Sequence, residues 1–384
     1  MPPRIYADNA ATTRLSEKAL EAMLPYFREE FGNPSAIHSY GVEAKKALED
    51  ARRRTAKVLG ALSTEIFFTS GGTESDNWAI RGVAEQKGGK GGHIVSSRAE
   101  HNAVLKTLEK LEGEGFETTY LEPDRLGRIS PEDLERSIRP DTILISLMTA
   151  NNVTGTIQNV KELARVASLR RVAFHTDAVQ AAGHVPVNCR DLGVDLLSVS
   201  AHKFHGPKGV GVLYAKIPRL PPPLLTGGGQ ERGGRSGTEN VPGAVGLATA
   251  LEEAAERTRE APGALEALRD RLISGILEIE GAALTGDPVN RLPGHASFVF
   301  EGIGHSARLV NSLNEAGICA SSGSACSASS QEASHVLLSM GYSPREALGS
   351  LRLTLSHENT MEEAEFIIEK VRESALRHRT RPAT

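Results

Sequence analysis

The stretch "VDLLSVSAHKFHGPKGVGVLYA" (residues 194–215) decides the fold class. "VDLLSVS" is an apolar run typical of a strand covered on both faces, and "GVGVLYA" is a second strand. Lys203 follows directly on the first strand, between His202 and His205, and a Gly-Pro turn comes next. A lysine at a strand end is ordinarily a solvated surface residue. At the ligand-binding edge of an α/β sheet, however, a lysine whose pKa is lowered can form a Schiff base with a carbonyl compound.

The same alternation of strand and helix extends outward from about residue 60. "EIFFTSG" (65–71), "HIVSS", "TILISLM" (142–148) and "VAFHTDA" read as strands, and residues 73–85 and 101–112 read as helices. Alternation on this scale predicts a mainly parallel sheet with helices on both sides. Its ligand should lie outside the carboxyl ends of the strands.

Length and composition limit the classes of protein to which this chain can belong. A chain of 384 residues suggests two domains, and a net charge of −4 gives no electrostatic case for nucleic acid as the main ligand. The N-terminus has no apolar signal region, and no run approaches the roughly 18 apolar residues of a membrane span. Three cysteines without CxxC spacing argue against a disulfide framework or a zinc site and for a reducing compartment. We therefore expect a cytoplasmic protein without a metal centre.

The pattern breaks after the last of these strands. Residues 218–237, "PRLPPPLLTGGGQERGGRSG", have no periodicity, and a helix from about Pro242 to Thr258 then ends the large domain. We place this domain at residues 15–257. A small domain combines residues 1–14 with 258–384 and carries a cysteine loop at about 319–333.

Three further fragments follow predicted strands. Asp177 in "HTDAVQ" could pair with a ring nitrogen or simply cap a turn. "TSGGTESDN" (69–77) could bind a phosphate at a helix N-terminus, through backbone N–H groups and the Thr73 hydroxyl, or be a plain glycine turn. His101 could stack on a flat ring or only cap the helix that follows it. Each fragment alone is a weak signal.

Together, the fragments resemble a known family. A glycine turn with threonine, a histidine, "NN", Asp-x-x-Gln and Ser-x-His-Lys come in the order found in fold-type I enzymes that use pyridoxal phosphate (PLP). "YADNAATT", "FGNPSAIHSYG", "RSGTEN" and above all "SSGSACSAS" look like the cysteine desulfurases of the NifS/IscS type, in the class-V aminotransferase family, and specifically like their first main group. The resemblance implies an α/β fold with a mainly parallel seven-stranded sheet sandwiched by helices, plus a smaller α+β domain. It also implies PLP-dependent removal of sulfur from L-cysteine.

The resemblance assigns roles to individual residues. Lys203 would hold PLP covalently and move protons at the substrate, Asp177 would pair with the ring nitrogen, and His101 would stack on the ring. Arg352 would grip the substrate carboxylate, a bidentate task suited to a guanidinium, with Asn33 beside it. The other implied contacts are Gln180 and Asn152 near the ring's 3-oxygen, Gly72, Thr73, Ser200 and His202 at the phosphate, and Thr238 reaching in from the other subunit of a homodimer.

Cys326 lies in "CASSGSACSASS" (319–330), which alone reads as a small-residue linker with an incidental thiol. In a cysteine desulfurase, a loop cysteine attacks the sulfur of bound L-cysteine, leaves alanine, and passes the resulting persulfide to an acceptor, such as an iron–sulfur scaffold protein. The resemblance makes Cys326 this nucleophile. We expect residues 322–330 to move, because one thiol must visit two places. Cys189 and Cys319 match no catalytic position and are interpreted as packing residues.

The sequence departs from the family at two positions near these motifs. Val153 stands where the family usually has glutamate, and Ala333 where proline is common. Three alternatives remain open: a selenocysteine lyase, a PLP aminotransferase on the same fold, and a non-catalytic scaffold. An aminotransferase needs no second nucleophile, so Cys326 argues against it.

Overall fold

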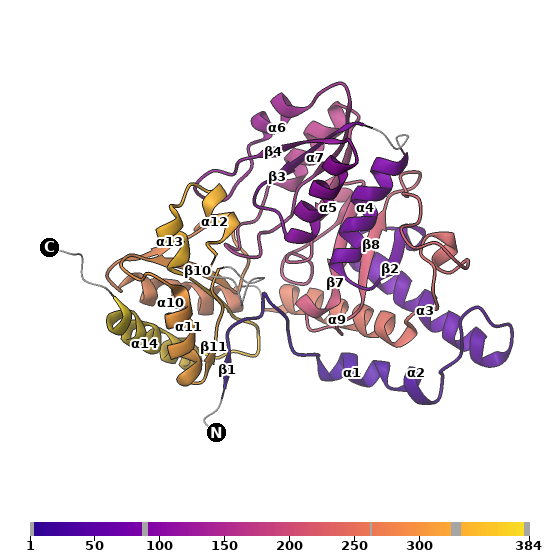
Figure 1. Ribbon diagram of the computed structural model, residues 1–384. Helices are drawn as coiled ribbons and strands as arrows, with labels where there is room; N and C mark the ends of the chain where they lie inside the picture. Colours follow the sequence, from indigo (N-terminus) through magenta and orange to yellow (C-terminus); the bar gives the residue numbers. More distant parts are fainter. Residues whose placement is uncertain (1–3, 87–90, 262, 324–331, 380–384) are drawn as a thin grey trace.

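A seven-stranded sheet forms the centre of the computed structural model, which describes residues 4–86, 91–261, 263–323 and 332–379 (Figure 1). The strand order is β2-β8-β7-β6-β5-β3-β4. Neighbouring strands are parallel except at β8, which is antiparallel to both β2 and β7. The prediction of a mainly parallel seven-stranded α/β sheet is confirmed. The strands are β2 (Ile66–Thr69), β3 (His93–Ser97), β4 (Glu117–Leu121), β5 (Thr142–Ser146), β6 (Ala173–Asp177), β7 (Leu196–Ser200) and β8 (Gly211–Ala215).

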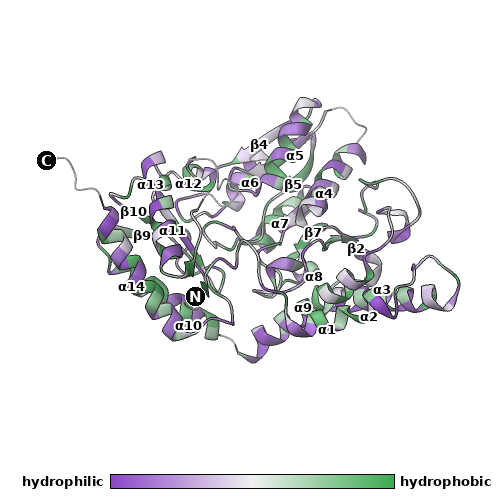
Figure 2. Cartoon of the chain, turned by 60° about the horizontal axis from the view of Figure 1, so that its bottom comes forward, coloured by the Kyte–Doolittle hydropathy of each residue, from purple (hydrophilic) through white to green (hydrophobic). Residues whose placement is uncertain are grey.

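Helices cover both faces of this sheet. Successive strand residues point to opposite sides, so Ile94 and Leu196 pack with α4 and α5, whereas Val95 and Leu197 pack with α3, α7 and α9. Figure 2 shows the interior strands β5 and β7 largely in the colour of hydrophobic residues. The helices of these two layers are α1 (Glu17–Met23), α2 (Pro25–Arg28), α3 (Ser39–Val58), α4 (Gly72–Gln86), α5 (Asn102–Gly113), α6 (Pro131–Ser137), α7 (Val160–Leu169), α8 (Cys189–Leu192) and α9 (Val241–Glu260).

Side-chain caps fix where several helices begin. Ser130 accepts a hydrogen bond from the Asp133 amide at the start of α6, and Pro131 occupies the first turn, as the sequence predicts. Thr360 and Glu363 form the predicted capping box of α14 (Met361–His378). Three short 3-10 turns complete the helical elements: η1 (Ser63–Glu65), η2 (Ala201–Lys203) and η3 (Glu231–Gly233).

The C-terminal part builds a second core with the N-terminal strand. Ile5 and Ala7 pack in one apolar cluster with α10, α11, α14 and the strands β10 and β12. Strand β1 lies parallel to β11, and β12-β10-β9 form a three-stranded antiparallel sheet. These elements are β1 (Ile5–Tyr6), β9 (Ala282–Leu284), β10 (His295–Phe300), β11 (Ile318–Cys319), β12 (Ser350–Thr354), α10 (Ala264–Leu277), α11 (Ser306–Glu315), α12 (His335–Ser339) and α13 (Pro344–Leu348).

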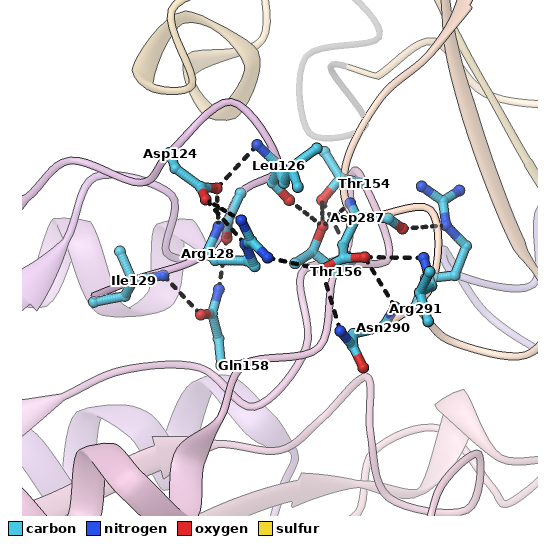
Figure 3. A network of polar contacts seen from close by, with 12 residues as sticks. Asp124, Leu126, Arg128, Ile129, Thr154, Thr156, Gln158, Asp287, Asn290 and Arg291 are labelled. Carbon is cyan, nitrogen blue, oxygen red and sulfur yellow. Dashed lines mark hydrogen bonds and ion pairs between the residues drawn. The ribbon is translucent and has the colours of Figure 1, made fainter. Parts of the chain in front are cut away.

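A buried polar network joins the two parts of the chain (Figure 3). The Thr156 hydroxyl donates to the carbonyl of Leu126 and accepts from the Asp287 amide, at 2.8 and 3.0 Å. Arg291 donates from Nε to the carbonyl of Asp287 at 2.7 Å. The network anchors the connection between β5 and α7, which carries Asn152, against residues from the C-terminal part.

The boundary predicted between residues 257 and 258 stays a prediction, and α9 continues to Glu260. Within the part of the chain that the structure describes, no helix has the length and apolar character to cross a membrane.

Candidate active site

The predicted site residues gather where the parallel strands end. Asp177 is the last residue of β6 and Ser200 the last of β7, while Lys203 lies in η2 directly after β7. His101 lies between β3 and α5, and Gly72 begins α4 just after β2. Because β2, β3, β6 and β7 run in one direction, these positions share one edge of the sheet.

Asp177 is a buried carboxylate near Lys203 and His101. It is 7% exposed, and its Oδ1 accepts a hydrogen bond from the Val179 amide at 2.8 Å. Burial raises the pKa of Asp177, and charge on His101 and Lys203 opposes that rise. A carboxylate in this setting can hold a proton on a neighbouring ring nitrogen.

His101 caps α5, which is one of the two roles left open by the sequence. Its Nδ1 accepts a hydrogen bond from the Ala103 amide at 3.1 Å. The cap fixes the imidazole at the strand edge, near Asp177 and Lys203. Stacking of this ring on a cofactor stays a prediction.

The N-terminal segment crosses the site and contacts Lys203. Lys203 Nζ donates to the carbonyls of Ala10 and Ala11 at 2.6 and 2.9 Å, and Gln180 Nε2 donates to the same Ala10 carbonyl at 3.0 Å. His202 Nδ1 lies 3.1 Å from the Thr12 hydroxyl. The backbone of "NAATT" therefore belongs to the site, a contribution that residue-type reasoning missed and only the motif "YADNAATT" signalled.

The glycine turn before α4 packs closely against side chains from the ends of β6 and β7. A Cβ added at Gly72 would lie 2.6 Å from Val179 Cγ2 and 3.6 Å from Ser200 Cβ, so only glycine fits beside these side chains. The predicted phosphate residues Gly72 and Ser200 are thus neighbours, at a helix N-terminus, where the first backbone N–H groups lack partners within the helix and can bind an anion. Thr73 is exposed in the same turn. Together with the Lys203 amine and the Asp177 carboxylate, this donor set fits PLP: a phosphate, an aldehyde and a pyridine nitrogen each have a matching group.

Arg352 reaches the site from β12. It is 1% exposed; its Nη2 donates to Asp8 Oδ1 at 2.7 Å and its Nη1 donates to the carbonyl of Asn152 at 2.9 Å. Arg352 Nε has no hydrogen-bond partner among the described residues. The guanidinium is thus held rigidly and retains donors for a further acceptor.

Two predicted contacts are not assembled within this single chain. Asn33 is exposed in the connection between α2 and α3, where its Oδ1 accepts from the Ser35 amide at 2.9 Å. Figures 1 and 2 place α2 and α3 on the opposite side of the molecule from β10, the partner strand of β12. Thr238 is exposed just before α9. Their roles stay predictions.

The three cysteines occupy different settings. Cys326 lies outside the described residues, as do residues 324–330 of the segment expected to move. Cys189 is buried in the core below the sheet, and burial raises the pKa of its thiol, as expected for a packing residue. Cys319 is half-buried on β11, where it pairs with Tyr6 of β1.

Two buried acids behind the site were not predicted. Asp76 on α4 is fully enclosed, with its Oδ1 3.6 Å from His175 Nε2; burial first, and then the charge of Asp177, raise its pKa well above the usual range. Glu100 accepts from the Met148 amide at 3.0 Å, and burial likewise raises its pKa. In the sequence both look like surface acids near helix starts, so no local pattern indicated that these side chains are buried.

Comparison with known proteins identifies the family to which the chain belongs. A model of the aminotransferase class-V family matches residues 5–367. The chain is 52% identical to the cysteine desulfurase IscS of Methanosarcina thermophila, over 96% of this chain and 91% of that protein. A solved NifS-like protein superposes with a TM-score of 0.90 at 42% identity, covering 96% of this chain and 98% of the other. A structure described as SspA in complex with cysteine gives a TM-score of 0.82 at 37% identity, covering 91% and 98%. The chain therefore belongs to the aminotransferase class-V family and, within it, to the PLP-dependent cysteine desulfurases of the NifS/IscS type.

Proposed function

We propose that this enzyme removes sulfur from L-cysteine as a persulfide on Cys326 and delivers it to an acceptor protein. The observation that carries the assignment of residues is the meeting of Lys203, Asp177 and Arg352, which come from two parts of the chain, around one strand edge. PLP, when bound, supplies an electron sink for charge that develops at the substrate Cα.

The described residues supply binding, orientation and proton transfer. Lys203 holds the cofactor and then moves a proton at the substrate Cα. Asp177 keeps the ring nitrogen protonated; burial raises the pKa of this carboxyl, and a protonated ring nitrogen beside it would favour its ionised form. Arg352 binds the α-carboxylate with the donors that Asp8 and Asn152 leave available. Gly72, Thr73, Ser200 and His202 take the phosphate, while Gln180 and Asn152 lie toward the ring's 3-oxygen and His101 toward its face.

Cys326 acts as the nucleophile on sulfur. Its thiolate attacks the substrate sulfur, so an S–S bond forms as the substrate Cβ–S bond breaks. The electron pair of the broken Cβ–S bond takes one proton at Cβ, and the proton that Lys203 removed from Cα is returned there, which gives L-alanine; the outer persulfide sulfur is then transferred to an acceptor. We propose an iron–sulfur scaffold protein as that acceptor, because the relative from Methanosarcina thermophila is named IscS.

We further propose a homodimer that works in the cytoplasm. Thr238 is exposed, as a residue that reaches into another subunit must be. Large apolar side chains are exposed on one continuous segment of the N-terminal part: Leu20, Leu24, Phe27, Phe31, Ile37, Tyr40 and Val42. An apolar surface of this kind is typical of a protein interface.

A Lys203→Ala variant tests the assignment of the site. We expect the purified variant to lose the visible absorption band of bound PLP and to form no alanine from L-cysteine. A variant that kept the band and the activity would move the cofactor attachment to another lysine.

A further inference from the structure

The ion pair between Asp8 and Arg352 places a second carboxylate at the site where the substrate carboxylate binds. Asp8 Oδ1 accepts from Arg352 Nη2 at 2.7 Å, across a sequence separation of 344 residues. The side chains are 21% and 1% exposed, respectively, so the pair is largely shielded from water. Solvent screens charges only weakly in such a setting, so the negative charge of Asp8 repels any anion that binds to Arg352.

The backbone holds Asp8 in this place. The Thr354 amide donates to the carbonyl of Ala7 at 2.8 Å, and the Ala10 amide donates to the Thr354 hydroxyl at 2.9 Å. Thr354 lies two residues after Arg352 on the same strand. The backbone of Asp8 is therefore fixed to β12 on both sides, which keeps its carboxylate within reach of Arg352.

Arg352 nevertheless has N–H donors that neither Asp8 nor Asn152 uses. A guanidinium offers five N–H groups; the Asn152 carbonyl takes one on Nη1 and Asp8 takes one on Nη2, which leaves a second N–H on each of these two nitrogens. The α-carboxylate of L-cysteine thus binds as a second anion on a cation that Asp8 already neutralises. Two carboxylates that share one guanidinium repel each other.

We propose that Asp8 is a positioning residue with two effects. It orients the Arg352 guanidinium, and it lowers the affinity of Arg352 for the carboxylates of amino acids. The inference rests on the proposed role of Arg352. L-Alanine, the product, carries the same α-carboxylate and α-amine as the substrate. A permanent counter-charge therefore favours product release, because it keeps the site from retaining alanine.

Two substitutions separate the two effects. Asp8→Asn keeps an oxygen acceptor of the same shape for Nη2 but removes the charge. We expect the KM for L-cysteine and the inhibition constant of L-alanine both to fall about five- to tenfold, as expected when one close like charge is removed from a shielded site. Asp8→Glu keeps the charge but displaces the guanidinium by one methylene, so both constants should rise while kcat changes less.

Thermal unfolding provides a readout that does not depend on turnover. Asp8→Asn leaves Arg352 as an uncompensated buried charge, so the substrate-free holoenzyme should melt at a lower temperature than wild type. Added L-alanine should then raise the melting temperature of Asp8→Asn by more than it raises that of wild type. A residue with a purely structural role would lower stability without tightening the binding of alanine.

Two controls make failures distinguishable. Asp270→Asn breaks an ion pair of 2.8 Å to another buried arginine, Arg269, and should leave both constants unchanged. Arg352→Lys should raise the KM for L-cysteine by roughly tenfold or more, since a single ammonium replaces a guanidinium that can donate two parallel hydrogen bonds.

If Arg352→Lys has this effect but Asp8→Asn does not lower the two constants, the inference about Asp8 is wrong and the role of Arg352 stands. If Asp8→Asn does not fold, an unchanged KM in Asp8→Glu equally overturns it. An unchanged KM in Arg352→Lys overturns the proposed role of Arg352 itself.

Discussion

At the scale of single residues, two buried aspartates that lie close together have opposite tasks. Asp177 must be ionised to hold a proton on the ring nitrogen; burial raises its pKa, and the interactions with His101, the Val179 amide and Lys203 oppose that rise. Asp76 has no such cation beside it, and burial together with the charge of Asp177 raises its pKa. Asp76 is therefore the neutral member of the pair.

This division predicts different outcomes for the same chemical change. Asp177→Asn should lower the rate of alanine formation by roughly a hundredfold or more, because a neutral amide cannot stabilise the protonated ring. Asp76→Asn should lower it by less than about fivefold, since an amide resembles a protonated carboxyl in size and charge. Steady-state assays of both variants with bound PLP decide the matter. Equal losses would show that Asp76 is also ionised in the working enzyme.

At the scale of elements, the turn into α4 should tolerate no side chain at Gly72. Gly72→Ala would push a methyl group against Val179 and displace the backbone N–H groups that we propose bind the phosphate. We expect PLP to be lost on dialysis at least about tenfold faster than from wild type, because one phosphate contact is worth about a charge-assisted hydrogen bond. Gly113→Ala in α5 is the matched control, because a Cβ there meets nothing within 4 Å. Retention of PLP by Gly72→Ala at the wild-type rate would place the phosphate elsewhere.

Strand β10 should make the fold sensitive to acid. Burial, helped by the charge of Arg352, lowers the pKa of His295 to about 3, whereas an unfolded histidine titrates near 6.5. Between these values the unfolded chain holds a proton that the folded chain does not, so stability is lost as the pH falls. The His295→Gln substitution keeps an N–H donor for the Val153 carbonyl, which His295 Nε2 contacts at 3.0 Å.

We expect His295→Gln to reduce the loss of unfolding free energy between pH 7 and pH 5 by roughly 2 kcal/mol. Urea titrations at the two pH values measure this difference. His38→Gln, at an exposed position that caps α3, is the control for the replacement of a histidine by glutamine. The same acid loss in wild type and His295→Gln would mean that His295 does not contribute.

At the scale of the whole molecule, the exposed apolar segment predicts association of two chains. Phe31 and Ile37 are 65% and 98% exposed. The double substitution Phe31→Asp/Ile37→Asp should convert a dimer to a monomer in sedimentation velocity, because two charges would be buried without partners at the interface. Val289→Asp, at a 78% exposed position in the C-terminal part, serves as control. A double variant that sediments as the wild type does would exclude this surface as the interface.

The sequence predicted the parts of the molecule that have a local pattern. Strand runs, glycine turns and caps predicted the parallel sheet. Lys203 and Asp177 were proposed as site residues because each lies at or just after the end of a predicted strand. The pairing of Asp8 with Arg352 has no local pattern, since 344 residues separate the two. Burial of Asp76 and Glu100 was equally invisible, because a short acidic stretch at a helix start reads as a solvated surface until the elements packed over it are known.

The central claim is that cofactor chemistry and sulfur capture belong to different residues of one enzyme, and the Cys326→Ser variant tests it most directly. The measurement compares wild type and variant after incubation with L-cysteine, by PLP absorption and by mass spectrometry of the peptide that contains residue 326. Both proteins should keep bound PLP, while only the wild-type peptide should gain a sulfur atom and only the wild type should release sulfide to a reductant. Wild-type sulfide release from Cys326→Ser, with the added sulfur on Cys189 or Cys319, would contradict the account.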